Sequence, residues 1–498
     1  MHFAELFECR TRRDPHAPAL ADEHNGLLTN ADVSKRIHRA SARLQANGVR
    51  GGDVVAVKLP NRVELIIALF AAWRLKAAVT PINPSLAASE VSHQLIDSGA
   101  YIVITDDEAD YGMVNRLSVD LLAEPPTNSI PVLTPATPDH SDVALLVYTS
   151  GTTGRPKGVV LTHRNVLSMA ESMGAAMDSG PGTHSLLILP LFHVNGIVVS
   201  ALSPLLAGGR ATIAGRFDPQ TFFGLVEKHR PTYFSAGPTI YTMLAALPAE
   251  VTPDVSSLEF AVCGAAPMPP NLIHTFESRY GIPIFEGYGL SEATCASTTN
   301  PRNGIRKAGT VGIALPGQRV AIQAPDGSIV TDGSPGEVVI AGPTVMRGYL
   351  NQPEETAKVL VDGWLRTGDV GVIDEDGYLT LIDRAKDMII RGGENIYPKE
   401  IESVLHEHPG VHEAAVVGRP DAIYGQVPVA FVTTKAGGGA TTEDLTTHLE
   451  AALAKYKRPE IILAETIPKN AVGKIDKPAL RRRLGTPSPP TRKPEVTH

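Results

Sequence analysis

Short apolar runs alternate along the chain with segments whose apolar residues recur at helical spacing. Residues 54–59 form a mostly apolar run that predicts a short buried strand, and residues 63–74 carry apolar side chains at the spacing of a helix. Residues 100–105 and 143–148 predict two further strands. Strands that alternate with helices indicate an α/β fold in layers, with largely parallel sheets. We find no fixed-period repeat, which argues against a solenoid.

The pattern changes beyond about residue 384, where shorter elements follow one another. Helices are predicted over residues 400–407 and 443–456, and strands over residues 411–417, 427–433 and 460–463. These elements suffice for a small α+β domain of roughly a hundred residues. Residues 485–498 are rich in proline and basic residues, which is typical of a disordered tail. We therefore expect a large α/β domain over 1–384, a small α+β domain over 385–484 and a tail over 485–498.

Composition and charge add few constraints. Of the 498 residues, 43% are hydrophobic and 20% are charged, as in an ordinary soluble globular protein. The formal net charge of −8 gives no electrostatic reason to expect a nucleic-acid partner or an anionic membrane surface. Cys9, Cys263 and Cys295 lie far apart and form no CxxC pair, which argues against a disulfide framework and favours a reducing cytoplasm. A homodimer is compatible with these features.

One segment raises the question of a membrane span. Residues 186–206 are almost free of charge and long enough to cross a bilayer. They include Pro190, Gly196 and Pro204, which suit a strand, a turn and a second buried element better than a lipid-facing helix. The N-terminus carries charged residues in its first turns and no apolar segment of a secretory signal follows them. We therefore expect no transmembrane segment.

The strongest chemical signal is the string YTSGTTGRPKG at residues 148–158. Its glycines permit backbone conformations that turn a series of N–H groups toward an anion. Its Thr and Ser hydroxyls add donors and Lys157 adds a positive charge, so the string suits phosphate oxygens. It is not a Walker A loop, because Lys157 precedes Gly158 and no Ser or Thr follows the pair. From composition alone, a bare flexible loop is an equal alternative.

The same string resembles the phosphate-binding signature of the adenylate-forming superfamily, which includes acyl-CoA synthetases, luciferases and the adenylation domains of peptide synthetases. Other segments that resemble the motifs of this family follow in order, and together they cover nearly the whole chain except its tail. They are LPLFHVNG at 189–196, GAAP at 264–267, EGYGLSE at 286–292, Gly336-Glu337, GYL at 348–350, WLRTGD at 364–369, DRAKD at 383–387, RGGEN at 391–395 and PKNAVGKI at 468–475.

The resemblance implies ATP, Mg²⁺ and coenzyme A as cofactors and a small-molecule carboxylic acid as substrate. Glu292 and the Thr152 hydroxyl would hold Mg²⁺, which prefers one or two carboxylates together with phosphate oxygens. Taken alone, Glu292 also has a plain interpretation as an acid at a helix start. Lys157 would steady the outer phosphates. The nucleotide-binding residues implied by the resemblance are Thr149, Ser150, Gly151, Thr152, Thr153, Gly154, Gly264, Ala265, Ala266, Glu286, Gly287, Tyr288, Gly289, Ser291, Asp369 and Arg384.

The C-terminal block places Lys474 where the family carries its catalytic lysine. The substrate carboxylate and the α-phosphate are both anions, and a positioned ammonium offsets the repulsion between them. The resemblance implies that the small domain then rotates about a hinge at Lys386 and withdraws Lys474. Rotation would bring Gly392, Gly393 and Glu394 to the site, where two adjacent glycines leave room for the pantetheine of coenzyme A.

The acid is the least defined ligand. His193 follows Phe192 at the position where amino-acid-activating domains usually carry an aspartate, and a buried ammonium without a partner is costly. The pocket segments implied by the resemblance, 194–198, 233–241 and 293–297, are mostly small or apolar and contain no Arg or Lys. We therefore expect an uncharged aliphatic or aryl acid, with fatty-acid metabolism as one setting. His193 counts among the catalytic candidates as a pocket wall and acyl gate, not as a base.

Two other functions stay open from the sequence. An acyl-AMP ligase would pass the acyl group to a carrier protein, and a luciferase would oxidise the adenylate; we see no clear N-terminal insertion of the kind such ligases carry. A catalytically silent nucleotide-binding protein can share the fold, because fold does not fix function. Against the silent protein, Lys157, Glu292, Asp369, Arg384 and Lys474 all occur together. We therefore expect an AMP-forming acyl-CoA synthetase.

Overall fold

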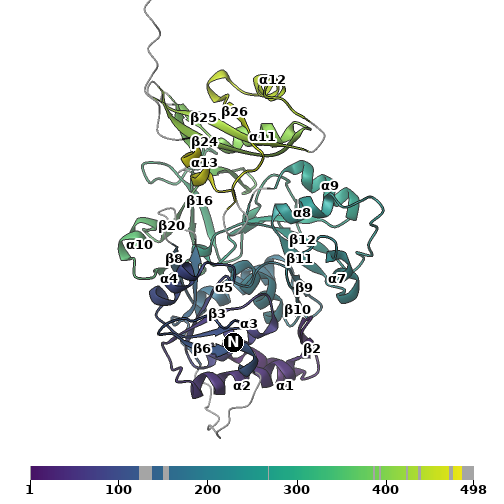
Figure 1. Cartoon of the computed structure of the whole chain (residues 1–498), viewed down its shortest axis with the longest axis vertical. Helices are drawn as coiled ribbons and strands as arrows, with labels where there is room; N and C mark the ends of the chain where they lie inside the picture. The colour runs from purple at the N-terminus through teal and green to yellow at the C-terminus, as the bar shows by residue number, and fades with distance from the viewer. Residues whose placement is uncertain are drawn as a thin grey trace, which may run out of the picture. The chain divides into compact units, whose positions relative to one another are not determined.

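The computed structural model describes residues 2–122, 137–149, 156–266, 268–384, 387–391, 394–421, 424–435, 439–469 and 475–484, without the side chains of residues 383, 384, 390, 394 and 395. The chain forms two compact units. Figure 1 shows the chain coloured by residue number. The first comprises Met1–Ser334, Val338–Thr367 and Ile373–Thr380, and the second comprises Pro335–Glu337, Gly368–Val372 and the chain from Leu381 onward. This mixed α/β architecture confirms the predicted fold class, whereas the domain boundary at residue 384 stays a prediction. The predicted tail lies outside the described residues.

A seven-stranded sheet in the first unit contains the strands predicted near the N-terminus. Its order is β18-β8-β7-β4-β3-β5-β6, and β3 pairs in parallel with both β4 and β5. At the opposite edge of the sheet the pairing is antiparallel: β8 is antiparallel to β7, and β18 is antiparallel to β8. The strands are β3 (Val54–Lys58), β4 (Ala78–Pro81), β5 (Ala100–Thr105), β6 (Asn115–Ser118), β7 (Val143–Thr149), β8 (Lys157–Thr162) and β18 (Gly348–Tyr349).

The predicted helix over residues 63–74 is α3 (Val63–Arg74), and each of its 12 residues is buried. A helix that is apolar on all sides belongs in the interior of a large protein. Its Trp73 is fully buried and donates a hydrogen bond from the indole N–H to the Ala144 carbonyl oxygen in β7, at 2.9 Å. The helices of the first unit are α1 (Leu6–Arg13), α2 (Asn30–Ala46), α3, α4 (Ala88–Ser98), α5 (His163–Ala176), α6 (Ser203–Leu206), α7 (Phe222–His229), α8 (Pro238–Ala245), α9 (Pro270–Tyr280) and α10 (Pro353–Val359).

A nine-stranded sheet has the order β15-β14-β13-β12-β11-β9-β10-β1-β2. Its central strands run parallel to one another, as the sequence predicts for an α/β fold. Figure 1 shows α7, α8 and α9 together beside β11 and β12. The strands are β1 (Pro18–Asp22), β2 (Gly26–Thr29), β9 (His184–Leu187), β10 (Arg210–Ile213), β11 (Tyr233–Ala236), β12 (Phe260–Cys263), β13 (Ile284–Tyr288), β14 (Thr298–Thr299) and β15 (Ile313–Ala314).

The apolar segment 186–206 does not form one long helix. It contains the end of β9, a turn, a π-helix over Asn195–Leu202 and the single turn α6. The prolines and glycines divide the segment, as the sequence predicts. In the described part of the chain, no helix has both the length and the apolar character that a bilayer crossing needs.

Two five-stranded sheets complete the structure. The first has the order β16-β17-β20-β19, with β21 paired to β20, and the second has the order β23-β22-β25-β24, with β26 paired to β25. Their strands are β16 (Arg319–Gln323), β17 (Gly336–Ala341), β19 (Leu360–Val361), β20 (Trp364–Ile373), β21 (Leu379–Arg384), β22 (Ile389–Arg391), β23 (Glu394–Ile396), β24 (Val411–Asp421), β25 (Gly425–Thr434) and β26 (Glu460–Leu463).

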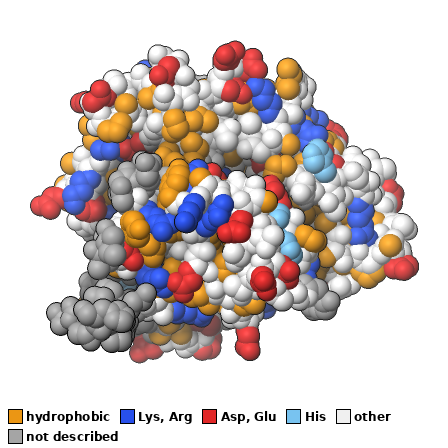
Figure 2. Space-filling view, turned by 90° about the horizontal axis from the view of Figure 1, so that it is seen from above, with side chains coloured by type: hydrophobic (Ala, Val, Ile, Leu, Met, Phe, Trp, Pro, Cys, Tyr) orange, Lys and Arg blue, Asp and Glu red, His pale blue; other side chains and the backbone are white. Residues whose placement is uncertain are grey.

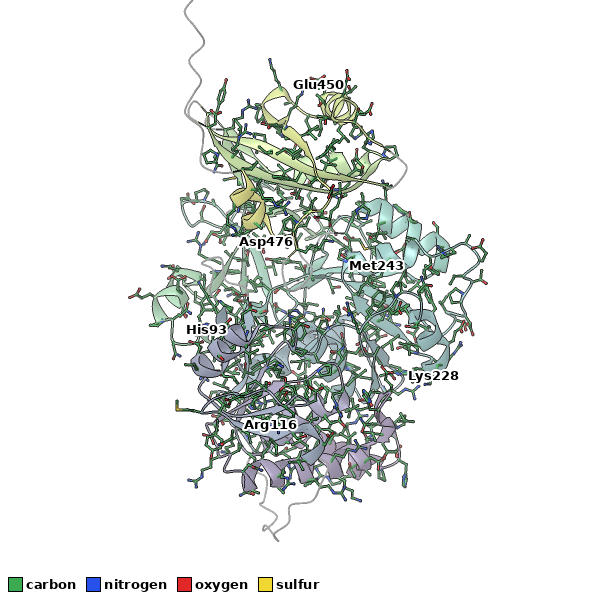
Figure 3. All side chains as sticks on the ribbon, in the orientation of Figure 1. His93, Arg116, Lys228, Met243, Glu450 and Asp476 are labelled. Carbon is green, nitrogen blue, oxygen red and sulfur yellow. The ribbon has the colours of Figure 1, made fainter. Side chains whose placement is uncertain are left out.

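The second unit adds α11 (Pro398–Glu407), α12 (Thr442–Ala452) and α13 (Lys477–Arg483). The helix predicted over 443–456 ends at Ala452, and a separate 3₁₀ turn follows over Lys455–Lys457. The side chain of Asp476, labelled in Figure 3, accepts a hydrogen bond from the Ala479 N–H at 2.9 Å and so caps α13. On the face of the molecule seen in Figure 2, acidic side chains lie among basic ones.

Candidate active site

Parallel strands bring two of the predicted nucleotide segments to one edge of the nine-stranded sheet. β9, β11, β12 and β13 are neighbours in parallel register, so their carboxyl ends meet at the same edge. Open α/β sheets bind their ligands in the crevice outside such ends. The residues that leave this edge include the predicted segments 264–266 and 286–289, which follow or end two adjacent strands. This edge is therefore the candidate site.

Glycine occurs at this edge for two different reasons. Among the described residues, a Cβ atom added at Gly264 would meet the Gly287 carbonyl oxygen at 3.8 Å and nothing nearer, so it would fit without a clash. A Cβ atom at Gly289 would lie 1.9 Å from the Cys295 carbonyl oxygen, so the fold itself requires glycine there. Ala265 has a φ of 70°, which is unusual for a residue with a side chain. Open backbone beside a strained residue is typical of a surface that a ligand approaches closely.

The described ends of the predicted phosphate string, at residues 148–149 and 156–158, belong to or adjoin two antiparallel strands. Thr149 at the end of β7 pairs with Lys157 at the start of β8, and Tyr148 pairs with Gly158. Ser150, Gly151, Thr152, Thr153 and Gly154 lie outside the described residues. The pairing holds Thr149 and Lys157 side by side in the seven-stranded sheet.

Gly158 is tightly packed and does not adopt a left-handed backbone, which corrects the role that the sequence suggested for it. Its φ is not among the positive values of the chain. A Cβ atom at this position would lie 3.2 Å from both the Leu350 Cβ and the Tyr148 ring. The Tyr148 hydroxyl in turn donates to the Asp97 carboxylate at 2.7 Å, which fixes the ring beside the loop.

Lys157 and Glu292, which the sequence assigned to the phosphates and the metal, belong to one contact network. The Lys157 ammonium lies 2.6 Å from a Glu355 carboxylate oxygen and 4.9 Å from the centre of the Tyr349 ring. The Tyr349 hydroxyl donates to the Glu292 carboxylate at 2.9 Å. Hydrogen bonds from Lys157 and then Lys358 lower the pKa of Glu355 to about 2. Burial, followed by the Glu292 charge, raises the pKa of Tyr349, so its hydroxyl stays protonated and donates.

Tyr349 and Glu355 were not predicted as site residues. Tyr349 lies in the GYL segment that resembles a family motif, so its sequence context contained a signal. Glu355 lies on α10 next to Glu354 and has no feature in the sequence that distinguishes the two acids. Only the three-dimensional contact with Lys157 identifies it.

Glu292 suits a Mg²⁺ ligand set that relies on phosphate oxygens. Its carboxylate accepts a hydrogen bond from a neutral hydroxyl, so its charge is not neutralised by that partner. Among the described residues, no three His, Cys, Asp or Glu side chains are grouped as a protein-only metal site would need. Magnesium typically takes one or two carboxylates and completes its shell with substrate phosphates and water. The residues present therefore fit the ion.

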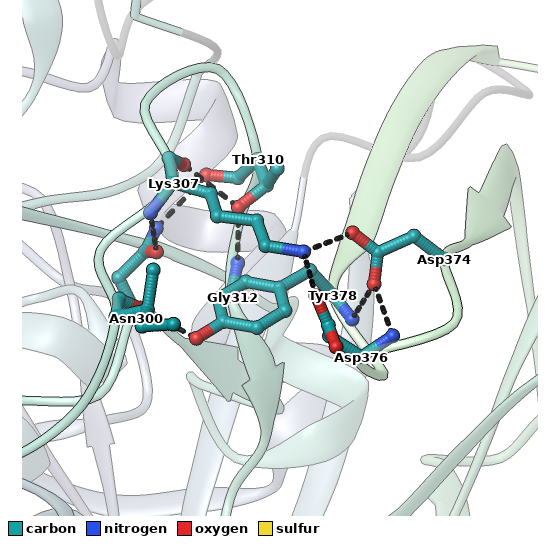
Figure 4. Close-up of polar contacts among 8 residues, drawn as sticks. Asn300, Lys307, Thr310, Gly312, Asp374, Asp376 and Tyr378 are labelled. Atoms are coloured by element: carbon teal, nitrogen blue, oxygen red, sulfur yellow. Dashed lines mark hydrogen bonds and ion pairs between the residues drawn. The ribbon is translucent and has the colours of Figure 1, made fainter.

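Glu286 organises the loop beside the site. Its buried carboxylate accepts a hydrogen bond from the Gly309 N–H at 3.0 Å, and its carbonyl oxygen accepts one from the Asn300 N–H at 2.8 Å. The Asn300 side chain accepts a hydrogen bond from the Lys307 N–H at 3.0 Å (Figure 4). Glu286 thus holds the segment after β14 against β13. This positioning role is compatible with the predicted place of Glu286 at the nucleotide.

Lys307 connects the same loop to the turn between β20 and β21. Its ammonium lies 2.6 Å from Asp374, 2.7 Å from Asp376 and 4.3 Å from the centre of the Tyr378 ring (Figure 4). The hydrogen bond from Lys307, followed by one from the Tyr378 N–H, lowers the pKa of Asp374. Hydrogen bonds to Asp374 and then Asp376 raise the pKa of Lys307.

His193 lies at the entry to the π-helix. Its backbone N–H donates to the Pro190 carbonyl oxygen at 3.1 Å, and its ring lies 4.6 Å from the Phe192 ring. Gly196 is required nearby, because a Cβ atom there would lie 2.5 Å from the Pro190 carbonyl oxygen. π-helical turns are rare and occur frequently at functional sites.

Ser291 begins a 3₁₀ turn in the first unit, and the remaining predicted residues belong to the second unit. Asp369 is buried in β20, and the preceding Gly368 N–H donates to the Glu337 carboxylate at 3.0 Å. Arg384 ends β21 and Glu394 begins β23, but their side chains are not described. Lys386, Gly392, Gly393 and Lys474 lie outside the described residues, so their predicted roles stay predictions.

Comparisons with known proteins agree with this geometry. Residues 7–350 match the family model of the AMP-binding enzymes, and residues 400–474 match the model of their C-terminal domain. A feruloyl-CoA synthase from Amycolatopsis sp is 39% identical over 96% of this chain and 98% of its own length. A long-chain-fatty-acid–CoA ligase from Bacillus subtilis is 36% identical over 92% of this chain and 89% of its own length. The ATP-bound crystal structure of MatB from Rhodopseudomonas palustris superposes with a TM-score of 0.90 at 30% identity, covering 97% of this chain and 99% of that one.

We expect Glu355→Gln to increase the affinity of the chain for MgATP by at least about two- to fivefold, since exposed ion pairs contribute on that scale and this pair is partly buried. The substitution removes the carboxylate that neutralises Lys157, which leaves the ammonium free for phosphate oxygens. Calorimetric titration with MgATP measures the effect. Glu354→Gln is the matched control, since it removes the same charge from the same helix without touching Lys157. Equal changes in the two variants would mean that net charge alone is responsible.

We also expect the stabilisation by Lys307 to depend on pH in a defined way. Because the pKa of Asp374 is lowered, its contribution is complete above the ordinary carboxyl pKa of about 4 and is lost as the pH falls through the lowered value. Because the pKa of Lys307 is raised, its contribution is lost only as the pH rises through the raised value. The difference in Tm between the wild type and Lys307→Gln should be constant near neutral pH and shrink in strong acid. A difference that grows in acid would contradict this account.

Proposed function

The chain belongs to the family of AMP-binding enzymes, and from this premise we propose that it is an ATP-dependent acyl-CoA ligase. It would join an uncharged aliphatic or aryl carboxylic acid to coenzyme A through an acyl-adenylate, with release of AMP and pyrophosphate. One observation carries the proposal more than any other. A cation, Lys157, and a hard carboxylate, Glu292, meet through Tyr349 beside the hairpin loop, and this pair suits a triphosphate with its magnesium ion.

The first half-reaction requires alignment of two anions. The substrate carboxylate attacks the α-phosphorus of ATP and pyrophosphate leaves, so catalysis depends on positioning and on charge stabilisation. Lys157 would hold the outer phosphates, with Glu355 as the partner it exchanges for them. Mg²⁺, when bound by Glu292 and Thr152, would neutralise phosphate charge. Lys474 would place its ammonium between the carboxylate and the α-phosphate.

The second half-reaction requires access for a thiol. The sulfur of coenzyme A attacks the acyl carbonyl carbon of the adenylate and AMP leaves with the electron pair of the broken bond. In this proposal the small domain over 385–484 turns about Lys386, removes Lys474 and presents Gly392, Gly393 and Glu394 to the pantetheine.

Support for an uncharged acid comes from the residues around the π-helix and the adjacent strands. Val194, Gly196, Val199, Ser235 and Val262 carry no charge, so they offer no partner for a second carboxylate or sulfonate. The relatives include an oxalate–CoA ligase and a sulfoacetate–CoA ligase as well as ligases named for feruloyl and long-chain acids. The uncharged surroundings favour the feruloyl and fatty-acid type for this chain.

A pyrophosphate-exchange screen over aliphatic, aryl and dicarboxylic acids tests the proposal, repeated with coenzyme A to detect the thioester. We expect exchange with uncharged acids and release of AMP that depends on free coenzyme A. An acyl-AMP ligase would instead require a carrier protein for turnover. Bound ATP without exchange for any acid would identify a catalytically silent protein and would overturn the proposal.

Lys474→Ala should reduce adenylation by about a hundred- to a thousandfold, the loss typical when one electrostatic donor is removed from a transition state. Conversion of supplied acyl-AMP to acyl-CoA should be nearly unchanged, because that step takes place with Lys474 withdrawn. Lys469→Ala is the matched control from the same segment, since Lys469 is half-exposed and pairs with Glu413 at 3.0 Å. Equal loss of both half-reactions in Lys474→Ala would refute the assigned role.

A further inference from the structure

The two faces of the central strands pack against different hydrophobic cores. Successive side chains of a strand point to opposite faces. On β11, Tyr233 belongs to the large core that contains the π-helix, whereas its neighbour Phe234 belongs to the core beneath α7, α8 and α9. On β12, Phe260 and Val262 share the face of Tyr233. The face that carries Tyr233 is therefore the one that continues toward the π-helix and His193.

Side chains on this face become larger with distance from the site edge. The outermost positions after β11 and β12 are Gly237 and Gly264, and a Cβ atom added at either would meet nothing closer than 3.8 Å. Two residues back along each strand are Ser235 and Val262, which pair with each other across the strands. Two further residues back are Tyr233 and Phe260, whose rings stack at 5.0 Å with an interplanar angle of 8°. The face is open at its rim and closed by aromatic rings about 13 Å deeper, at about 3.3 Å per residue.

Little empty space remains beside the Tyr233 ring, at the deep end of this face. A cavity of about 10 Å³ remains between Tyr233, Val262, Val199 of the π-helix and Met173 and Met177 at the end of α5. Such a volume holds about one water molecule at most. An acyl chain that reached this depth would meet the Tyr233 ring.

Tyr233 is fixed in place by the π-helix. Its hydroxyl donates to the Val199 carbonyl oxygen at 3.2 Å. Burial raises the pKa of Tyr233 to about 12, so the hydroxyl keeps the proton that it donates. This hydrogen bond joins the π-helix to β11 at the deep end of the face. The Tyr233 ring cannot rotate away without breaking it.

Ser235 is the residue of this face that lies between the glycine rim and Tyr233. Its side chain is 1% exposed, and its hydroxyl oxygen has no hydrogen-bond partner in the described part of the chain. A buried hydroxyl without a partner costs free energy, and a single water molecule would satisfy it.

We propose that Tyr233 is the specificity-determining residue that closes the acyl pocket, so that the chain activates acids whose tail or ring ends within about 13 Å of the glycine rim and excludes longer acyl chains. The inference rests on the proposed function, because it concerns the acid of the same reaction. Tyr233 stacks on Phe260 and is bonded to Val199, so the end of the pocket is a rigid wall and not a flexible gate.

The experiment compares kcat/KM for adenylation over straight-chain acids from acetic to myristic acid and over aryl acids, for the wild type, Tyr233→Ala and Phe234→Ala. Wild-type activity should fall steeply beyond the acids that reach Tyr233. Tyr233→Ala should extend the range to longer acids, with a gain of about fourfold for each methylene accommodated, which corresponds to about 0.8 kcal/mol. Phe234→Ala removes a ring of similar size from the adjacent position and the opposite face, so it should lower stability without changing the chain-length profile.

Further variants keep the inference open to refutation if Tyr233→Ala does not fold. Tyr233→Leu shortens the side chain and Val262→Ala opens the same space from β12, so both should extend the profile. Tyr233→Phe keeps the ring and should leave the profile unchanged. A wild type that activates long acids as well as short ones, or profiles of the folded Tyr233 and Val262 variants that match the wild type, would overturn the inference. Absence of adenylation by the wild type with every acid would instead refute the proposed function.

Discussion

The parallel register of β11, β12 and β13 is the constraint on which the site depends. Because neighbouring parallel strands end at the same edge, the backbone after each strand reaches the ligand from the same side. Because side chains alternate between the two faces of a strand, one face of these strands orders a loop and the other faces the π-helix. Glu286 uses one face of β13 to order the loop at Gly309, while Gly264 and Ser235 lie on the opposite face, toward the π-helix.

The charged side chains Lys157 and Glu292 both have protein partners in the structure. Lys157 is occupied by Glu355 and by the Tyr349 ring, and Glu292 is occupied by the Tyr349 hydroxyl. A partly buried ammonium and carboxylate without partners would be costly. In the proposed reaction, a triphosphate and its magnesium ion would replace these partners, which come from α10 and β18. Under this proposal, Glu355 and Tyr349 act before the nucleotide binds and take no direct part in the reaction.

The sequence could predict the elements and the chemistry better than it could predict the contacts. Hydrophobic periodicity identified β3, α3, β5 and β7, because the buried residues of each element form a run or a helical pattern within a dozen consecutive residues or fewer. Local rules also showed that residues 186–206 could not be one helix, though not that a π-helix would replace it. Glu355 and Lys307 were missed, since their partners are 198 and 67 or more residues away and neither lies in a recognisable string. Sequence patterns give residue types at fixed spacing, whereas such pairs depend on tertiary contacts.

The division of the strand faces also explains how one architecture can serve acids of different size. Residues that shape the acyl wall, such as Tyr233 and Val262, alternate along the strands with Phe234 and Cys263, which pack in the other core. A change of volume on the wall leaves the opposite face and the backbone register intact, so the nucleotide edge keeps its geometry. The aromatic stack at the end of the pocket can therefore be altered without moving the residues proposed for adenylation. Substitution at a few wall positions can change the size of the substrate. The charged network at β8 and α10 tolerates less change, because each contact requires a particular charged or polar partner.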